Sequence, residues 1–122
     1  MSTKMEFQEV FDQLKAILIP YSTKLTLVMN TKGTLQLEGA YSEKWKRSLF
    51  FGSVQVKKNY VSFYLMPVYM YPGLLKGISP ALKKRMQGKS CFNFKQPEPD
   101  LFAELTRLTK SGFDRFMAEE YS

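Results

Sequence analysis

The sequence predicts an α+β fold in which an antiparallel sheet of about five strands carries an N-terminal and a C-terminal helix on one face. Apolar residues recur at three- and four-residue spacing near both ends of the chain, which is typical of amphipathic helices. Between the ends, runs rich in Phe, Val and Tyr are separated by short polar turns, as the strands of a sheet are. No connection between these runs is long enough for a parallel crossover, so we expect antiparallel pairing.

The two long helices are predicted at residues 7–18 and from about Pro99 toward the C-terminus. Pro20 ends the first helix, because the residue before a proline is pushed out of the α region. In the second helix, apolar residues from Phe102 to Phe116 line one face, and Gly112 weakens the helix near its end.

The strands are predicted as two hairpins and one final strand. Residues 25–30 pair with 35–38, and residues 48–56 pair with 60–66. Cys91–Phe94 forms the last strand, with both phenylalanine rings on one face. Alternate apolar residues of the first strand are expected to face the same way: Leu25, Leu27 and Met29. The predicted core includes Phe7, Phe11, Leu14, Phe63, Phe92, Phe94, Leu105 and Leu108.

The segment between the second hairpin and the last strand is predicted to be partly helical. Pro67–Pro72 breaks the strand pattern, and residues 73–78 form one helical turn. Ser79 as N-cap, followed by Pro80, opens a short helix that ends at Gly88.

The composition favours a single domain over residues 1–122. The chain has 122 residues, of which 44% are hydrophobic, enough for one core. It contains no histidine, so the commonest general base and metal ligand is missing. Its single cysteine, Cys91, allows no intrachain disulfide, which favours a reducing compartment. An enzyme is therefore the least expected class, and we expect neither a cofactor nor a metal.

The net charge of the chain indicates which kinds of partner it can attract. The formal net charge is +7, which favours an anionic small molecule or nucleic acid, although a basic balance also serves solubility alone. No run approaches the roughly 20 apolar residues of a membrane span, and the N-terminal residues lack a signal-peptide pattern. We therefore expect a cytoplasmic protein without a membrane partner, as a monomer or a homodimer.

Two neighbouring segments supply most candidate ligand-binding residues. The first is rich in Tyr and Met, side chains that line pockets or stack on bases. The second is basic, and charges this close act together within a Debye length of roughly 8 Å, as a phosphate site requires. Aromatic packing on a sheet and stabilisation of a helix C-terminus are the structural alternatives. The candidates are Tyr64, Met66, Tyr69 and Tyr71 in the first segment, and Lys83, Lys84, Arg85 and Lys89 in the second.

Cys91 is a further candidate, since Lys89 and Lys95 fall on the same face of its predicted strand. Nearby lysines favour a thiolate, but without histidine there is no proton acceptor for nucleophilic catalysis. A cysteine in a strand also serves as a small packing residue, so both interpretations stay open.

Glu6, Glu9 and Asp12 lie at three-residue spacing on the first helix and share a face. Acidic residues near a helix N-terminus stabilise the helix. Carboxylates also bind hard cations, which makes these three a weak candidate metal site.

Four stretches resemble a bacterial family of domains of unknown function typified by YdhG: Leu49–Gly52, Lys58–Ser62, Tyr64–Pro72 and Ser79–Phe94. The resemblance covers nearly the whole chain and implies a compact α+β fold similar to that of frataxin; some relatives are proposed iron chaperones. A frataxin-type site uses an acidic ridge, whereas this basic chain offers three carboxylates on its first helix. The leading hypothesis is therefore a non-enzymatic module that binds an anionic small molecule or nucleic acid, and the alternative is an intracellular iron chaperone.

Overall fold

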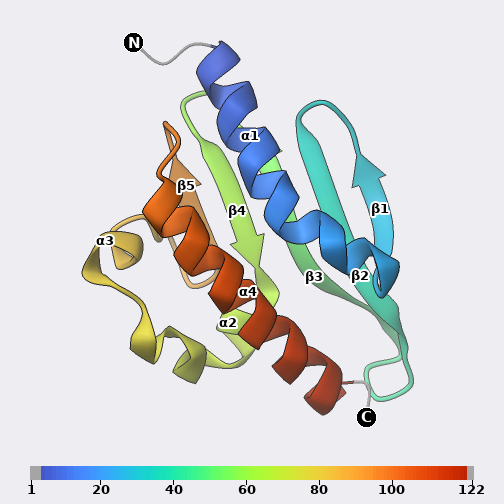
Figure 1. The fold of residues 1–122 in the computed structure, drawn as a ribbon. Helices are drawn as coiled ribbons and strands as arrows, with labels where there is room; N and C mark the ends of the chain where they lie inside the picture. Colours follow the sequence, from blue (N-terminus) through green and yellow to red (C-terminus); the bar gives the residue numbers. More distant parts are fainter. Residues whose placement is uncertain (1–3, 121–122) are drawn as a thin grey trace.

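The computed structural model describes residues 4–120, with side chains from residue 6 onward, as a two-layer α+β structure (Figure 1). A five-stranded antiparallel sheet in the order β1-β2-β3-β4-β5 forms one layer. The helices α1 (Lys4–Leu18) and α4 (Pro99–Glu120) lie across one face of it, so the predicted class is confirmed. Residues 1–3, on which part of the signal-peptide expectation rests, lie outside the described residues.

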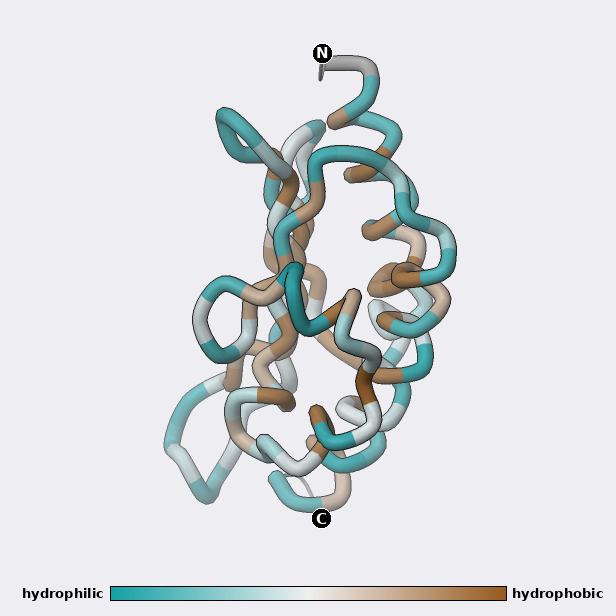
Figure 2. The backbone as a smooth tube through the Cα atoms, turned by 90° about the vertical axis from the view of Figure 1, so that its left-hand side faces the viewer, coloured by the Kyte–Doolittle hydropathy of each residue, from teal (hydrophilic) through white to brown (hydrophobic). Residues whose placement is uncertain are grey.

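The long helices pack on the sheet because each carries one apolar stripe. Phe11 and Leu14 of α1 are buried, as are Leu105 and Phe116 of α4. The chain after α1 continues as the 3-10 helix η1 (Ile19–Thr23), which contains the predicted terminating proline. Figure 2 shows hydrophobic segments of both layers facing the space between them. No helix within residues 4–120 has both the length and the apolar content of a membrane span.

Each neighbouring pair of strands is antiparallel, as predicted. The strands are β1 (Thr26–Asn30), β2 (Thr34–Ser42), β3 (Arg47–Val56), β4 (Val61–Leu65) and β5 (Cys91–Phe94). Four fully buried register partners form a row beneath the helices: Leu35, Val54, Phe63 and Phe92. Every predicted core residue is buried except Phe7, which is half-buried at the rim beside Gly33 and Val56.

β1 departs from the predicted alternate burial. All of its residues are exposed, and Leu27, Val28 and Met29 have 40%, 44% and 47% of their surface accessible. The register shifts between Leu27 and Met29, and such a bulge breaks the alternation. β1 is also an edge strand, so it has a neighbour on one side only. Of the predicted apolar face, only Leu25, which precedes the strand, is buried.

Three short helices connect β4 to β5: α2 (Met66–Met70), η2 (Pro72–Gly77) and α3 (Pro80–Lys83). The strand pattern breaks at this segment as predicted, since β4 ends at Leu65. The prediction did not include the helix α2 there, which contains Pro67 because a proline in the first turn of a helix loses no hydrogen bond. All three helices contact α4 and lie on its side of the sheet. The predicted N-cap is confirmed, since Ser79 Oγ accepts from the N–H of Leu82 at 3.1 Å.

The sequence predicts that Gly88 ends a helix, but in the structure it does not. The helix α3 stops at Lys83, and residues 85–87 run along the outer edge of β5. There the N–H of Asn93 donates to the carbonyl of Arg85 at 2.8 Å, and the N–H of Gln87 donates to the carbonyl of Cys91 at 2.9 Å. Pairing with β5 thus satisfies backbone groups that a longer helix would pair internally. Gly88 has a φ of 88° in the turn that follows, a conformation that favours glycine.

Candidate functional site

The face of the sheet that points away from the helices is polar. On this face, Ser53, Tyr64 and Cys91 form one row of register partners. A second row consists of Gln55, Ser62 and Asn93. The helices α1 and α4 lie on the other side of the sheet, and the three short helices contact α4 (Figure 1). This uncovered face therefore brings two of the predicted site residues, Tyr64 and Cys91, side by side.

Hydrogen bonds join the side chains of the polar face across strands. Ser62 Oγ donates to Oδ1 of Asn93 at 2.7 Å, and Nδ2 of Asn93 donates to Oε1 of Gln87 at 2.8 Å. Lys57, in the turn after β3, places its Nζ 5.9 Å from the centroid of the Tyr64 ring. The face thus presents ordered amide and hydroxyl groups with an ammonium group close to an aromatic ring.

A hollow of about 490 Å³, which we call the β5 hollow, adjoins the polar face at the outer edge of β5. It is lined by two cations, three amides, one phenol and one carboxylate: Arg85, Lys95, Gln87, Asn93, Gln96, Tyr60 and Glu98. Asn93 and Gln87 belong to both surfaces, so the hollow and the polar face are continuous. Arg85 and Gln87 reach the hollow because residues 85–87 pair along β5.

Arg85 and Glu98 form a bidentate ion pair in the β5 hollow. The Nε and Nη2 of Arg85 donate to the two carboxylate oxygens of Glu98 at 2.7 and 2.8 Å. These bonds raise the pKa of Arg85, so its guanidinium stays charged. Within residues 6–120, no carboxylate pairs with the exposed Lys95. The hollow therefore carries a net positive charge, and the Lys95 ammonium is available to a ligand.

The structure favours the packing interpretation of Cys91. Burial raises the pKa of its thiol, and the hydrogen bonds of Ser62 and Tyr64 and the charge of Lys57 offset this only in part. The thiol contacts Oδ1 of Asn93, with Sγ at 3.2 Å. Cys91 is thus a small polar residue of the sheet face, with its thiol held protonated.

The predicted basic segment does not converge on one point. Lys83 and Lys84 are exposed on and just after α3, whereas Arg85 turns into the β5 hollow. Lys89 does not line the β5 hollow, and its Nζ lies 5.9 Å from the centroid of the exposed Tyr69 ring. The cause is the early end of α3, after which the chain turns to pair with β5.

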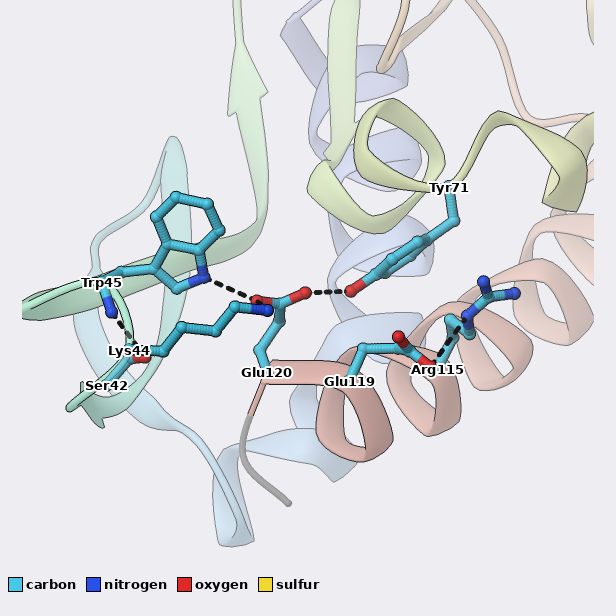
Figure 3. Close-up of polar contacts among 7 residues, drawn as sticks. All are labelled: Ser42, Lys44, Trp45, Tyr71, Arg115, Glu119 and Glu120. Carbon is cyan, nitrogen blue, oxygen red and sulfur yellow. Dashed lines mark hydrogen bonds and ion pairs between the residues drawn. The ribbon is translucent and has the colours of Figure 1, made fainter.

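Met66 and Tyr71 lie outside the hollow. Met66 is half-buried at the start of α2, and Tyr71 belongs to a cluster around Glu120 at the end of α4 (Figure 3). The Tyr71 hydroxyl donates to Oε2 of Glu120, the indole Nε1 of Trp45 donates to Oε1 at 2.6 Å, and Lys44 Nζ lies 3.7 Å from Oε1. Burial alone would raise the pKa of Glu120, but these donors outweigh it and hold the pKa below its usual value. Both carboxylate oxygens are engaged, which indicates a structural cluster.

The acidic residues of α1 were predicted as a weak metal site, and the described residues do not support that prediction. Within residues 6–120, no group of three or more carboxylate or cysteine side chains is placed to hold a metal ion. Glu9 and Asp12 are exposed and accept hydrogen bonds from Gln13 at 3.3 Å and from Gln8 at 2.9 Å. Nothing in this part of the chain favours the iron hypothesis over a solvated helix face.

The sequence pattern does not point to three of the seven residues that line the β5 hollow. Gln87, Gln96 and Glu98 lie in segments predicted as turn and linker, where polar residues are ordinary. Only the pairing of residues 85–87 with β5 brings them together, and no local periodicity predicts that pairing. The one usable indication is the alternation in β5, which directs Asn93 away from the core.

Comparisons of the chain with protein-family models, with curated proteins and with solved structures found no match. The resemblance to YdhG-like domains therefore stays a prediction from the sequence. The geometry and charge of the β5 hollow are the basis on which a function can be assigned.

Proposed function

We propose that this chain is a non-enzymatic binding module for an anionic small molecule held in the β5 hollow. The observation that carries the proposal is the Lys95 ammonium, which no carboxylate of the described residues pairs with, beside an Arg85–Glu98 pair whose acidic member is already engaged. An anion entering the hollow meets a net positive charge, and Gln87 and Tyr60 offer hydrogen-bond donors.

The dimensions of the hollow suit a small molecule. Its volume of about 490 Å³ falls within the range of roughly 300–1,000 Å³ that ligand sites occupy. The turn between β3 and β4, which leads into Tyr60, adds the exposed Lys57 and Lys58 at the same end of the sheet. These ammonium groups raise the local positive potential and steer anions toward the hollow. A phosphorylated or polycarboxylate metabolite is the class that these features support.

The chemistry near the hollow supports binding without catalysis. The sequence contains no histidine, and burial raises the pKa of the neighbouring Cys91. General-base catalysis works best with a group whose pKa lies near the working pH, such as histidine, and thiolate catalysis needs a thiol of lowered pKa. We also propose membership of the YdhG-like family and a cytoplasmic location, supported by the α+β architecture expected of that family and by the single unpaired Cys91.

Calorimetric titration with adenosine monophosphate and with inorganic pyrophosphate tests the binding proposal. We expect saturable binding of at least one probe, weakened about tenfold or more by Lys95→Glu, because that change removes a charged donor and adds a repulsive charge. Lys76→Glu makes the same charge change on η2, outside the hollow, and should leave the affinity within about twofold. Absence of binding to both probes, or equal losses in the two variants, would contradict the proposal.

A further inference from the structure

The tip of the β2–β3 hairpin presents two large aromatic side chains to solvent. Tyr41 is 56% exposed and Trp45, the only tryptophan of the chain, is 49% exposed. Both precede β3 and lie at the end of the sheet opposite the β5 hollow, since β3 runs from Arg47 at the hairpin to Val56 next to the turn before Tyr60. Figure 1 shows this hairpin and β5 at opposite sides of the molecule.

Two hydrogen bonds to Ser42 close the turn that carries Trp45. The N–H of Lys46 donates to the carbonyl of Ser42 at 2.7 Å, and the N–H of Trp45 donates to Ser42 Oγ at 3.3 Å. Lys46 has a φ of 58°, a left-handed conformation that side chains other than glycine rarely adopt. A strained residue of this kind persists only where its surroundings determine it.

The indole ring is anchored although half of its surface is exposed. Its Nε1 donates to the buried carboxylate of Glu120 at 2.6 Å (Figure 3). A ligand that stacks on Trp45 therefore does not have to immobilise the ring first. Pre-organisation of this kind lowers the entropic cost of binding.

Cations surround the exposed rings. Lys44, Lys46 and Arg47 are all exposed, and Lys44 Nζ lies 5.5 Å from the centroid of the Trp45 ring. Glu43 pairs with Lys46 at 3.5 Å, but both side chains are largely exposed, and such a pair is easily replaced by another anion. The hairpin tip thus combines aromatic faces with positive charge.

We propose that the hairpin tip is a contact site for single-stranded nucleic acid, with a base stacked on Trp45 and neighbouring phosphates held by Lys46 and Arg47. Stacking platforms flanked by cations are what sequence-tolerant single-strand binding requires. A duplex keeps its bases stacked on one another and does not offer them to an aromatic side chain. The hairpin tip shares no residue with the β5 hollow, so the nucleic-acid proposal and the proposed function are tested by separate experiments.

The fluorescence of Trp45 reports on the proposed contact directly, because no other tryptophan is present. We expect an oligothymidylate of about ten nucleotides to quench it, while the same strand in a duplex and inorganic polyphosphate of equal charge quench it far less. With two phosphates neutralised, by Lys46 and Arg47, the slope of log affinity against log salt should be roughly −1.4. Equal quenching by duplex or polyphosphate, or a response to anionic phospholipid vesicles but not to the oligonucleotide, would overturn the proposal.

Variants separate the hairpin from general basicity. Lys46→Glu with Arg47→Glu should weaken binding of a labelled oligothymidylate about tenfold or more, whereas Lys83→Glu with Lys84→Glu, an equal charge change, should leave most of it. Lys46→Gly removes the charge of Lys46 without straining the backbone, because glycine adopts the positive φ at no steric cost. It should keep the melting temperature at or above that of the wild type and still weaken binding. Equal loss in both double variants, or unchanged binding in Lys46→Gly, would refute the site.

Discussion

The indole Nε1 of Trp45 and Oε1 of Glu120 are joined by a hydrogen bond of 2.6 Å, although the two residues are 75 positions apart. Tyr71 donates to the other oxygen of the same carboxylate. One buried side chain at the end of α4 therefore holds the β2–β3 hairpin and the start of η2 in place (Figure 3). The order of the exposed hairpin tip depends on this buried contact.

Replacing Glu120 by Gln tests the energy of this cluster. The amide keeps one acceptor oxygen but presents an NH₂ donor to one of the two donors, Trp45 Nε1 or the Tyr71 hydroxyl. We expect a loss of about 1–3 kcal/mol in the free energy of unfolding, measured by urea denaturation at neutral pH. An unchanged urea midpoint would show that the cluster contributes nothing to stability.

The same variant carries a pH dependence. The pKa of Glu120 is lowered in the folded protein, so its contribution is complete above the unfolded value of about 4.3 and is lost as the pH falls through the lower folded value. The stability difference between wild type and Glu120→Gln should therefore shrink from neutral pH to about pH 3. A difference that stays constant or grows on acidification would contradict the assigned direction.

The packing of α4 on α2 depends on Gly112. A Cβ added there would lie 3.0 Å from Cβ of Pro67, tighter than most Cβ contacts, and 3.4 Å from its Cγ. We expect Gly112→Val to cost about 1–3 kcal/mol by overpacking, measured by thermal unfolding. Gly77→Val is the matched control, since no atom of the described residues lies within 4 Å of a Cβ at that position. A control that destabilises as much as Gly112→Val would assign the loss to the valine and not to the contact.

Phe63 lies in the central buried row of the sheet and has no exposed surface. Its replacement by Ala leaves a cavity between β4 and the helices, and we expect a loss of about 3–5 kcal/mol in the free energy of unfolding. Chemical denaturation followed by circular dichroism measures it. A midpoint equal to that of the wild type would mean that the register of β4 is different.

Individual residues show which parts of the fold could be predicted. Phe63 and Phe92 face the core as their strand alternation indicates, and the end of α1 follows from Pro20. The exposure of Met29 could not be predicted, because the bulge in β1 depends on how that strand pairs. Gly88 was assigned to a helix end because its neighbours favour a helix, whereas the pairing of residues 85–87 with the next strand, β5, decides the outcome.

The candidate site was predictable only where strand alternation reached it. Tyr64 and Cys91 fall on one face because adjacent antiparallel strands share a register. Arg85 reaches the β5 hollow through its ion pair with Glu98, 13 positions away, which depends on where α3 ends. Spacing along the chain contains no information on that contact, so Lys83 and Lys84 could not be separated from Arg85 in advance.

The most direct test of the binding proposal is a titration of the ¹⁵N-labelled protein with inorganic pyrophosphate, followed by amide chemical shifts. We expect saturable shifts concentrated at the β5 hollow, at Tyr60, Gln87, Asn93 and Lys95, with little change on α1 or at the hairpin tip. In Lys95→Glu the shifts should need about tenfold or more pyrophosphate to reach the same size, whereas in Lys76→Glu they should follow the wild-type titration within about twofold. Shifts spread over the whole basic surface, or confined to residues outside the hollow, would contradict the assignment of the site.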